Sequence, residues 1–183
     1  AFALTVLACA IWRIAEPGTG LMRDLTASVF TAAYVPFLLG FAALLTVQDN
    51  GPQRITAVVA TVVASDTGGY IAGVLFGKHP MAPTVSPKKS WEGFFGSALF
   101  CAVAGALFFW TLFDASPLLG VLFGLAMVAT ATLGDLGESM IKRDIGIKDM
   151  GNVLPGHGGL MDRLDSILPS VPVGWILLSL MLP

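Results

Sequence analysis

The sequence predicts an all-α, polytopic integral membrane protein with about six transmembrane helices. Three observations indicate this fold class. Only 12% of the 183 residues are charged and 55% are hydrophobic, whereas soluble domains carry about 25% charged residues. Several apolar stretches reach the roughly 20 residues that a helix needs to cross a bilayer. Basic residues gather in alternate connections between those stretches, as expected for a chain that crosses a membrane repeatedly.

The six predicted helices are residues 1–15, 26–47, 54–76, 93–113, 117–141 and 167–182. The first is short, and the chain opens inside it without a basic targeting segment. We therefore expect residues 1–183 to be one transmembrane domain from the C-terminal part of a longer protein. In the third helix, Gly69, Gly73 and Gly77 recur every four residues, which predicts a face that packs closely against a neighbouring helix.

The basic residues predict the orientation of these helices. If the connections alternate between the two sides, nine Lys and Arg lie on one side and Arg54 lies alone on the other. The nine are Arg13, Arg23, Lys78, Lys88, Lys89, Lys142, Arg143, Lys148 and Arg163. Because Lys and Arg are enriched in cytoplasmic connections, residues 16–25, 77–92 and 142–166 are predicted to face the cytoplasm.

Carboxylates also occur inside predicted helices, where an ionised side chain costs about 2.5–3.5 kcal/mol and usually faces a cavity or a partner. Asp135, Glu138, Ser139 and Lys142 follow helical spacing, so a polar stripe descends from the cytoplasmic end into the membrane. The pattern favours a functional role for Asp135. For Glu138, an internal ion pair with Lys142 is an equal alternative.

Asp66 lies ten residues from the nearest end of its predicted helix, about 15 Å at 1.5 Å per residue. A functional role is favoured for this buried carboxylate as well. The alternative is that the neighbouring Ser65 and Thr67 simply provide its hydrogen bonds. A second metal ligand and a structural acceptor also remain open for Asp66.

The last helix begins near residue 159, with Asp162 and Asp165 in its first turn. The helix dipole favours negative charge there, so capping alone is one explanation of both carboxylates. However, the His-Gly-Gly sequence at 157–159 offers bare backbone N–H groups, and Arg163 offers a guanidinium suited to phosphate. Carboxylates from two helices, together with such groups, are the parts needed to hold Mg²⁺ against phosphate oxygens. The sequence contains no GxxxxGK[ST] phosphate-binding loop.

The connection 77–92 carries Lys88, Lys89 and Ser90 just before Trp91. Two lysines ahead of an interfacial tryptophan are consistent with a membrane anchor that attracts anionic headgroups. They are equally consistent with a phosphate-binding site. His79 beside Pro80 is interpreted as structural.

Residues 139–165, SMIKRDIGIKDMGNVLPGHGGLMDRLD, resemble the signature of the phosphatidate cytidylyltransferases, the CDP-diacylglycerol synthases. That signature runs Ser-x-x-Lys-Arg, four residues, Lys-Asp, then Pro-Gly-His-Gly-Gly, two residues and Asp-Arg-x-Asp. The stretches SDTGGYIAG and SPKKSWEG also resemble upstream motifs of this family, so the resemblance extends over essentially the whole chain. It places the active-site motif on the last two helices.

The resemblance implies an enzyme of the bacterial inner membrane, with its active site facing the cytoplasm, that transfers CMP from CTP to phosphatidic acid. The expected partners are these two substrates, the lipid bilayer and a second copy in a homodimer, with no nucleic acid. The resemblance also implies a divalent metal, Mg²⁺ or Mn²⁺, held by Asp135 and Asp162, with K⁺ at the same centre.

The candidate site residues follow from the charge pattern and the resemblance together. The catalytic candidates are Asp135, Asp162, Lys142 and Arg163. The substrate-binding candidates are Asp66, Lys88, Lys89, Ser90, Ser139, Arg143, Lys148, Asp149, His157, Gly158, Gly159 and Asp165.

Two other function classes stay open on the sequence. A related CTP-dependent membrane lipid kinase or transferase would use similar residues, although the Asp-Gly-x-x-Ala-Arg pattern of the CDP-alcohol phosphotransferases is absent. A transporter is the other alternative, because buried aspartates and glycine-broken helices also mark ion paths.

Overall fold

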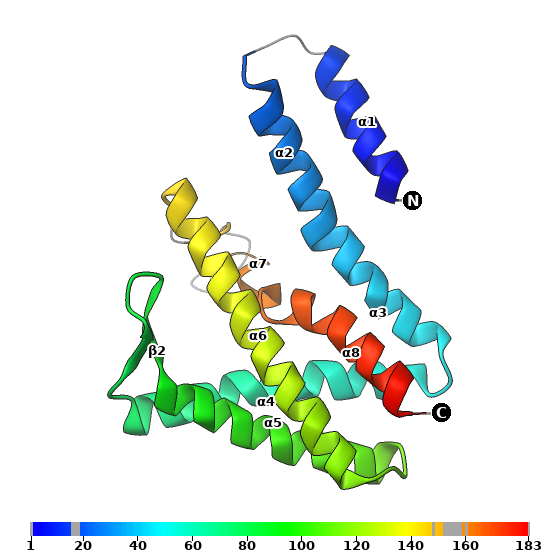
Figure 1. Ribbon diagram of the computed structural model, residues 1–183, viewed down its shortest axis with the longest axis vertical. Helices are drawn as coiled ribbons and strands as arrows, with labels where there is room; N and C mark the ends of the chain where they lie inside the picture. The colour runs from blue at the N-terminus through cyan, green and yellow to red at the C-terminus, as the bar shows by residue number, and fades with distance from the viewer. Residues whose placement is uncertain (1, 16–18, 148, 152–158, 160, 183) are drawn as a thin grey trace.

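Helices make up nearly all of the fold (Figure 1). The structure, a computed structural model, describes residues 2–15, 19–147, 149–151, 159 and 161–182. In chain order the helices are α1 (Phe2–Ala15), α2 (Leu21–Ala32), the π-helix η1 (Ala33–Phe37), α3 (Leu38–Val47), α4 (Gly51–Phe76), α5 (Trp91–Leu112), α6 (Pro117–Ile145), α7 (Met161–Leu164) and α8 (Ile167–Met181). A two-stranded hairpin, β1 (Pro80–Ala82) and β2 (Ser86–Ser90), separates α4 from α5.

Five helical segments are long and apolar enough to cross a membrane, which confirms the predicted all-α polytopic class. They are residues 21–47, 51–76, 91–112, 117–145 and 161–181. Helix α1 corresponds to the predicted first span but is shorter than the others, so the count of six is approximate. The segment 21–47 is one continuous rod in which Pro36, which cannot donate a backbone hydrogen bond, lies in the π-helical turn.

The boundaries of two helices differ from the predicted ones in ways that matter for the site. Helix α6 continues to Ile145 rather than ending near 141, so Lys142 and Arg143 belong to its last turns. Gly146, with a φ of 72°, ends it in the left-handed conformation typical of a helix C-cap. The short helix α7 precedes the last predicted helix. Asp162 belongs to α7 and is therefore not part of α8.

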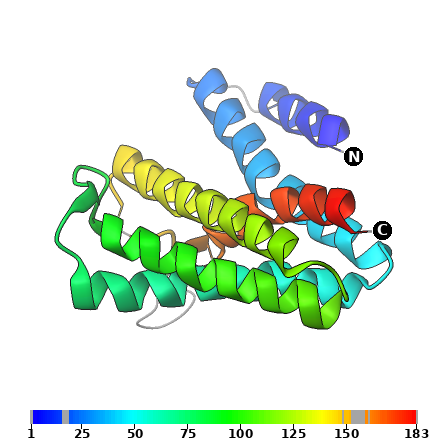
Figure 2. The same ribbon diagram turned by 60° about the horizontal axis from the view of Figure 1, so that its bottom comes forward.

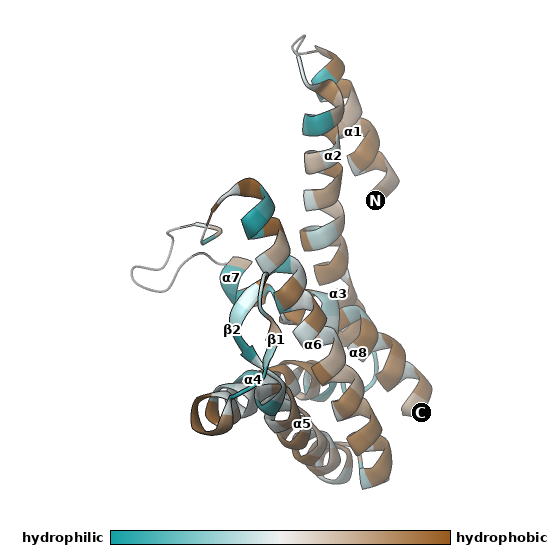
Figure 3. Cartoon of the chain, turned by 60° about the vertical axis from the view of Figure 1, so that its left-hand side comes forward, coloured by the Kyte–Doolittle hydropathy of each residue, from teal (hydrophilic) through white to brown (hydrophobic). Residues whose placement is uncertain are grey.

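The hairpin is a feature that the hydropathy pattern does not predict. Pro80 pairs with Ser90 and Ala82 with Ser86 across the two antiparallel strands. Prolines at 80, 83 and 87 disfavour a helix in this connection, and a two-stranded ribbon has free edges on which proline is tolerated. The hairpin extends from the adjacent ends of α4 and α5 and lies beside α6 (Figure 3).

Close contacts between glycines hold α4, α5 and α6 together. A Cβ at Gly105 of α5 would lie 2.1 Å from the backbone oxygen of Gly120 in α6. One at Gly69 of α4 would lie 2.5 Å from Ser97 Oγ in α5, and Gly73 and Gly77 face Ser90, the last residue of β2, which caps α5. The predicted close-packing face of α4 is therefore confirmed. Figures 1 and 2 both show α4 and α5 running side by side.

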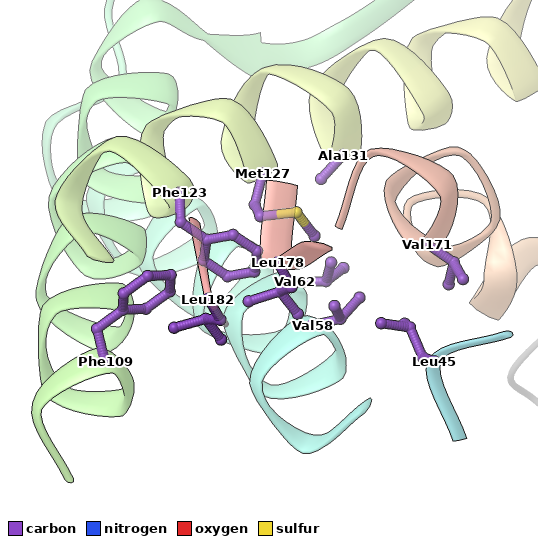
Figure 4. Packing of buried hydrophobic residues seen from close by; sticks show 10 residues of the cluster. All are labelled: Leu45, Val58, Val62, Phe109, Phe123, Met127, Ala131, Val171, Leu178 and Leu182. Atoms are coloured by element: carbon purple, nitrogen blue, oxygen red, sulfur yellow. The ribbon is translucent and has the colours of Figure 1, made fainter. Parts of the chain in front are cut away.

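Helix α8 completes the core by packing against α3, α4 and α6. Ten buried apolar side chains from α3, α4, α5, α6, α8 and the residue after α8 form one cluster (Figure 4): Leu45, Val58, Val62, Phe109, Phe123, Met127, Ala131, Val171, Leu178 and Leu182. At one end of this core the buried Arg54 donates hydrogen bonds to the backbone oxygens of Asp49 and Leu178, both at 2.9 Å. The α1–α2 pair extends away from the core (Figure 2).

The Gly105–Gly120 contact gives the first testable prediction. Gly120→Ala should push α5 and α6 apart and lower the free energy of unfolding by about 1–3 kcal/mol, since the new methyl group would meet backbone atoms of α5 within 3 Å. The measurement is the thermal unfolding midpoint of the detergent-purified protein. Gly40→Ala is the matched control, because no atom lies within 4 Å of a Cβ there. Equal midpoints for the two variants would contradict the close approach of these helices.

Candidate active site

A pocket of about 380 Å³ opens between α4, the hairpin, the start of α5 and α6. Four of the predicted ionisable residues line it: Asp66, Lys88, Lys89 and Asp135. Hydroxyl groups of Ser65, Ser86, Ser90, Ser97, Thr132 and Ser166 line the remainder of its polar wall, and Tyr70, Met81 and Phe94 its apolar part. The pocket therefore combines both signs of charge with several hydrogen-bonding groups inside a predominantly apolar molecule.

Strand β2 brings the two lysines to this pocket. The Lys89 ammonium lies 2.6 Å from Asp135 Oδ2 on α6, and Lys88 lies beside it on the pocket wall. Ser90 ends the strand and begins α5, because its Oγ accepts a hydrogen bond from the Gly93 backbone N–H at 3.1 Å. The position of both lysines on the pocket wall favours the phosphate-binding interpretation over a simple membrane anchor.

A second charged cluster, the Lys142 cluster (Glu138, Lys142 and Asp162), lies where α6 meets α7. The Lys142 ammonium is 3.0 Å from Glu138 Oε2 and 2.6 Å from Asp162 Oδ1. The first contact is the internal ion pair that the sequence left open. The Glu138 side chain is fully buried; Lys142 supplies the positive charge beside it, and the Asp165 carboxyl lies within reach as a hydrogen-bond partner.

Asp162 also accepts hydrogen bonds from backbone N–H groups outside α7. Its carboxylate accepts a hydrogen bond from the Met150 backbone N–H at 3.0 Å and another from the Gly159 N–H at 2.6 Å. Both bonds come from backbone that precedes α7, so Asp162 ties that backbone to the helix rather than capping the first-turn N–H groups of α7. Because Lys142 contacts the same carboxylate, capping does not account for all of its surroundings.

The polar stripe of α6 divides into two rows that face different neighbours. Asp135, Ser139 and Arg143, spaced four apart, face the hairpin: Ser139 Oγ donates to Asp135 Oδ1 at 3.4 Å, and Arg143 Nε donates to the Val85 backbone oxygen at 2.6 Å. Glu138 and Lys142 face α7 instead. Helix α6 is thus shared between the pocket and the Lys142 cluster.

Six further residues were predicted to belong to the site, and the structure describes three of them: Asp149, Arg163 and Asp165. Asp165 accepts a hydrogen bond from the Ser166 N–H at 2.6 Å, and its backbone packs against Gly134, next to Asp135. Asp149 and Arg163 are exposed. Lys148, His157 and Gly158 lie outside the described residues.

Several residues of the pocket were not predicted. Ser65 and Tyr70 lie within the SDTGGYIAG stretch. Ser65 is four residues before Gly69 and Tyr70 is four residues after Asp66, so helical spacing would have placed each pair on one face. Thr132 lies one turn before Asp135 on α6 and offered the same signal. Met81, Ser86 and Ser166 gave no such sequence signal. Met81 and Ser86 reach the pocket through the hairpin, and Ser166 reaches it through the turn between α7 and α8.

The two carboxylates predicted to hold a divalent cation lie in different clusters: Asp135 meets Lys89 on the pocket wall, and Asp162 meets Lys142 where α6 joins α7. Asp135 and Asp162 each hold a lysine ammonium at 2.6 Å, so each carboxylate already sits where positive charge is stabilised. No group of three or more His, Cys, Asp or Glu within the described part of the chain forms a complete protein cage for a metal. Mg²⁺ usually takes only one or two protein carboxylates and completes its octahedron with substrate phosphates and water.

The Lys142 cluster gives a second prediction. Lys142→Met should leave the Glu138 charge buried without a cation and lower the free energy of unfolding by about 3–5 kcal/mol. The double variant Lys142→Met/Glu138→Gln should recover most of that loss, since it removes the buried charge as well. Thermal unfolding of both variants in detergent measures the effect. A Lys142→Met protein that unfolds at the wild-type temperature would show that Lys142 does not neutralise Glu138.

Comparison with known sequences identifies the family of the chain. The sequence model of the cytidylyltransferase family matches residues 1–181. The chain is 48% identical, over 98% of its length, to the phosphatidate cytidylyltransferase of Mycobacterium leprae and 50% identical, over 96% of its length, to that of Mycobacterium bovis. Against the phosphatidate cytidylyltransferase of Haemophilus influenzae it is 43% identical over 75% of its length. These alignments cover 63%, 62% and 51% of the three relatives, so the chain spans less than two thirds of their length. The chain belongs to the cytidylyltransferase family.

Proposed function

We propose that the protein transfers CMP from CTP to phosphatidic acid, giving CDP-diacylglycerol and pyrophosphate. The observation that carries this proposal is a polar pocket among membrane-spanning helices, where Lys89 and Asp135 meet at 2.6 Å. Such a pocket suits phosphate groups, and the apolar helices around it suit a lipid substrate. The names of the mycobacterial relatives support the same reaction.

In this reaction a phosphate oxygen of the lipid attacks the α-phosphorus of CTP, and the bond from that phosphorus to pyrophosphate breaks. The attacking phosphomonoester is already an anion, so the protein has little general-base work to do. Positioning and charge neutralisation dominate instead. Lys88, Lys89, Lys142 and Arg163 are the cations that would meet the phosphates, with the hydroxyls of the pocket wall as further donors.

Asp135 and Asp162 would hold the divalent cation, Mg²⁺ or Mn²⁺, and K⁺ would share the same centre. A cation held there neutralises charge on the reacting phosphates and orients them. The carboxylates that would hold it come from α6 and α7, which the Lys142 contacts already hold together. Asp66 and Asp165 add negative charge nearby, from α4 and from the residue after α7.

The orientation predicted from the basic residues puts the hairpin, the end of α6 and α7 on the cytoplasmic side of the inner membrane. Figure 3 shows hydrophilic residues on the hairpin and towards the upper end of α6, whereas α8 and the lower part of α6 are mainly hydrophobic. Water-soluble CTP would reach the pocket from the cytoplasm. Phosphatidic acid would reach it laterally from the adjacent leaflet.

The reaction type is tested with CTP labelled at either the α- or the γ-phosphate. The purified full-length protein in phosphatidic acid micelles should place the α-label in lipid and release the γ-label as pyrophosphate. A lipid kinase would place the γ-label in lipid, and a transporter would leave both labels in nucleotide while moving solute in proteoliposomes. Either of those outcomes would exclude the proposed transfer.

The role of the two aspartates is tested separately. Asp135→Asn and Asp162→Asn should each reduce kcat/KM by about 100-fold or more, because a positioned charge opposite the reacting phosphates is lost. Each should also weaken Mn²⁺ binding measured by electron paramagnetic resonance without substrates. Asp114→Asn is the matched control: it lies in the α5–α6 loop away from the pocket, and its φ of 48° suits asparagine. Normal Mn²⁺ binding by both site variants would rule out the assigned metal ligands.

A further inference from the structure

Two contacts join the hairpin to α6, and they lie at different heights along that helix. Near its free end, the hairpin presents the Val85 backbone oxygen to Arg143 Nε at 2.6 Å. Four residues later on β2, the Lys89 ammonium lies 2.6 Å from Asp135 Oδ2. The hairpin therefore runs along the last turns of α6 and is held at both ends of the shared length.

The lengths of the two elements match between these contacts. From Val85 to Lys89 an extended chain covers about 13 Å at roughly 3.3 Å per residue. From Asp135 to Arg143 a helix rises about 12 Å at 1.5 Å per residue. Because the spans agree within about 1 Å, the Arg143 contact and the Lys89–Asp135 pair fit one and the same register of the hairpin on α6. A one-residue slip would turn Lys89 to the opposite face of the strand.

The base of the hairpin is fixed independently. Glu92, in the first turn of α5, accepts hydrogen bonds from the backbone N–H groups of Lys78 and His79, both at 3.2 Å, and pairs with the His79 ring. The Trp91 N–H donates to the His79 backbone oxygen at 3.0 Å. With its base anchored to α5, the hairpin is held against α6 by the Lys89–Asp135 pair near that base and by the Arg143 hydrogen bond to Val85 at the far end.

We propose that Arg143 is a positioning residue, which acts on the substrate phosphates through Lys89 rather than by binding them itself. This inference rests on the proposed function and deepens it. The Arg143 guanidinium holds the hairpin by its backbone, and the hairpin in turn presents Lys88 and Lys89 to the pocket. The alternative is that Arg143 only compensates the C-terminal dipole of α6 or neutralises CTP directly. Neither alternative makes its effect depend on Lys89.

A double-mutant cycle separates these possibilities. Arg143→Ala should raise the KM for CTP about tenfold and change kcat less than about twofold, since one charge-assisted hydrogen bond that orders a binding lysine is lost. In a Lys89→Ala background the same substitution should change KM less than about twofold. Effects that multiply in the double variant would show that Arg143 binds substrate independently, and an unchanged KM in the single variant would show that it positions nothing. Both results overturn the proposal.

A second measurement follows the hairpin without any reaction. Limited trypsin digestion in detergent should cut after Lys88 or Lys89 several-fold faster in Arg143→Ala than in wild type, with the fragments identified by mass spectrometry. Arg23→Ala is the control, because it removes an exposed guanidinium from α2, far from the hairpin in sequence and packing. Unchanged cutting in Arg143→Ala would overturn the proposal. If wild type transfers no label from CTP, the proposed function fails while this digestion still decides the role of Arg143.

Discussion

The arrangement of the helices and the hairpin depends on ion pairs in which lysines neutralise carboxylates that lie among apolar helices. Asp135 receives Lys89 from the hairpin, and Lys142 of α6 neutralises Glu138 while reaching Asp162 of α7. An unpaired charge at this depth would cost several kcal/mol, so each pair constrains where its elements can lie. The site and the fold are therefore held by the same contacts.

Each of these ion pairs includes a residue of helix α6. One of its faces carries glycines that let α5 approach within van der Waals contact, and its C-terminal half carries two polar rows. The tight, nearly invariant spacing set by glycine contacts gives the polar rows a fixed frame. A catalytic arrangement that relies on positioning more than on proton transfer needs such a frame, because small displacements of phosphate-binding groups weaken catalysis strongly.

The sequence predicted the helices and many site residues because both leave local signals. Hydropathy marks membrane spans, helical spacing placed Asp135, Glu138, Ser139 and Lys142 near one another, and four-residue spacing revealed the packing face of Gly69, Gly73 and Gly77. The Glu138–Lys142 pair was foreseen as one of two alternatives since both residues lie on one helix. The hairpin escaped prediction because its strands are short and proline-rich, and Ser86 and Met81 entered the pocket with it.

The sequence by itself determined a membrane-spanning helical chain, its family signature and the set of charges available for chemistry. Only the tertiary structure decided which charges meet: Lys89 with Asp135, Lys142 with Asp162, and Arg143 with a backbone oxygen of the hairpin. The reason is physical. Burial and helical periodicity are properties of neighbouring residues, whereas ion pairs between elements depend on how closely helices pack and on the register of a strand along them.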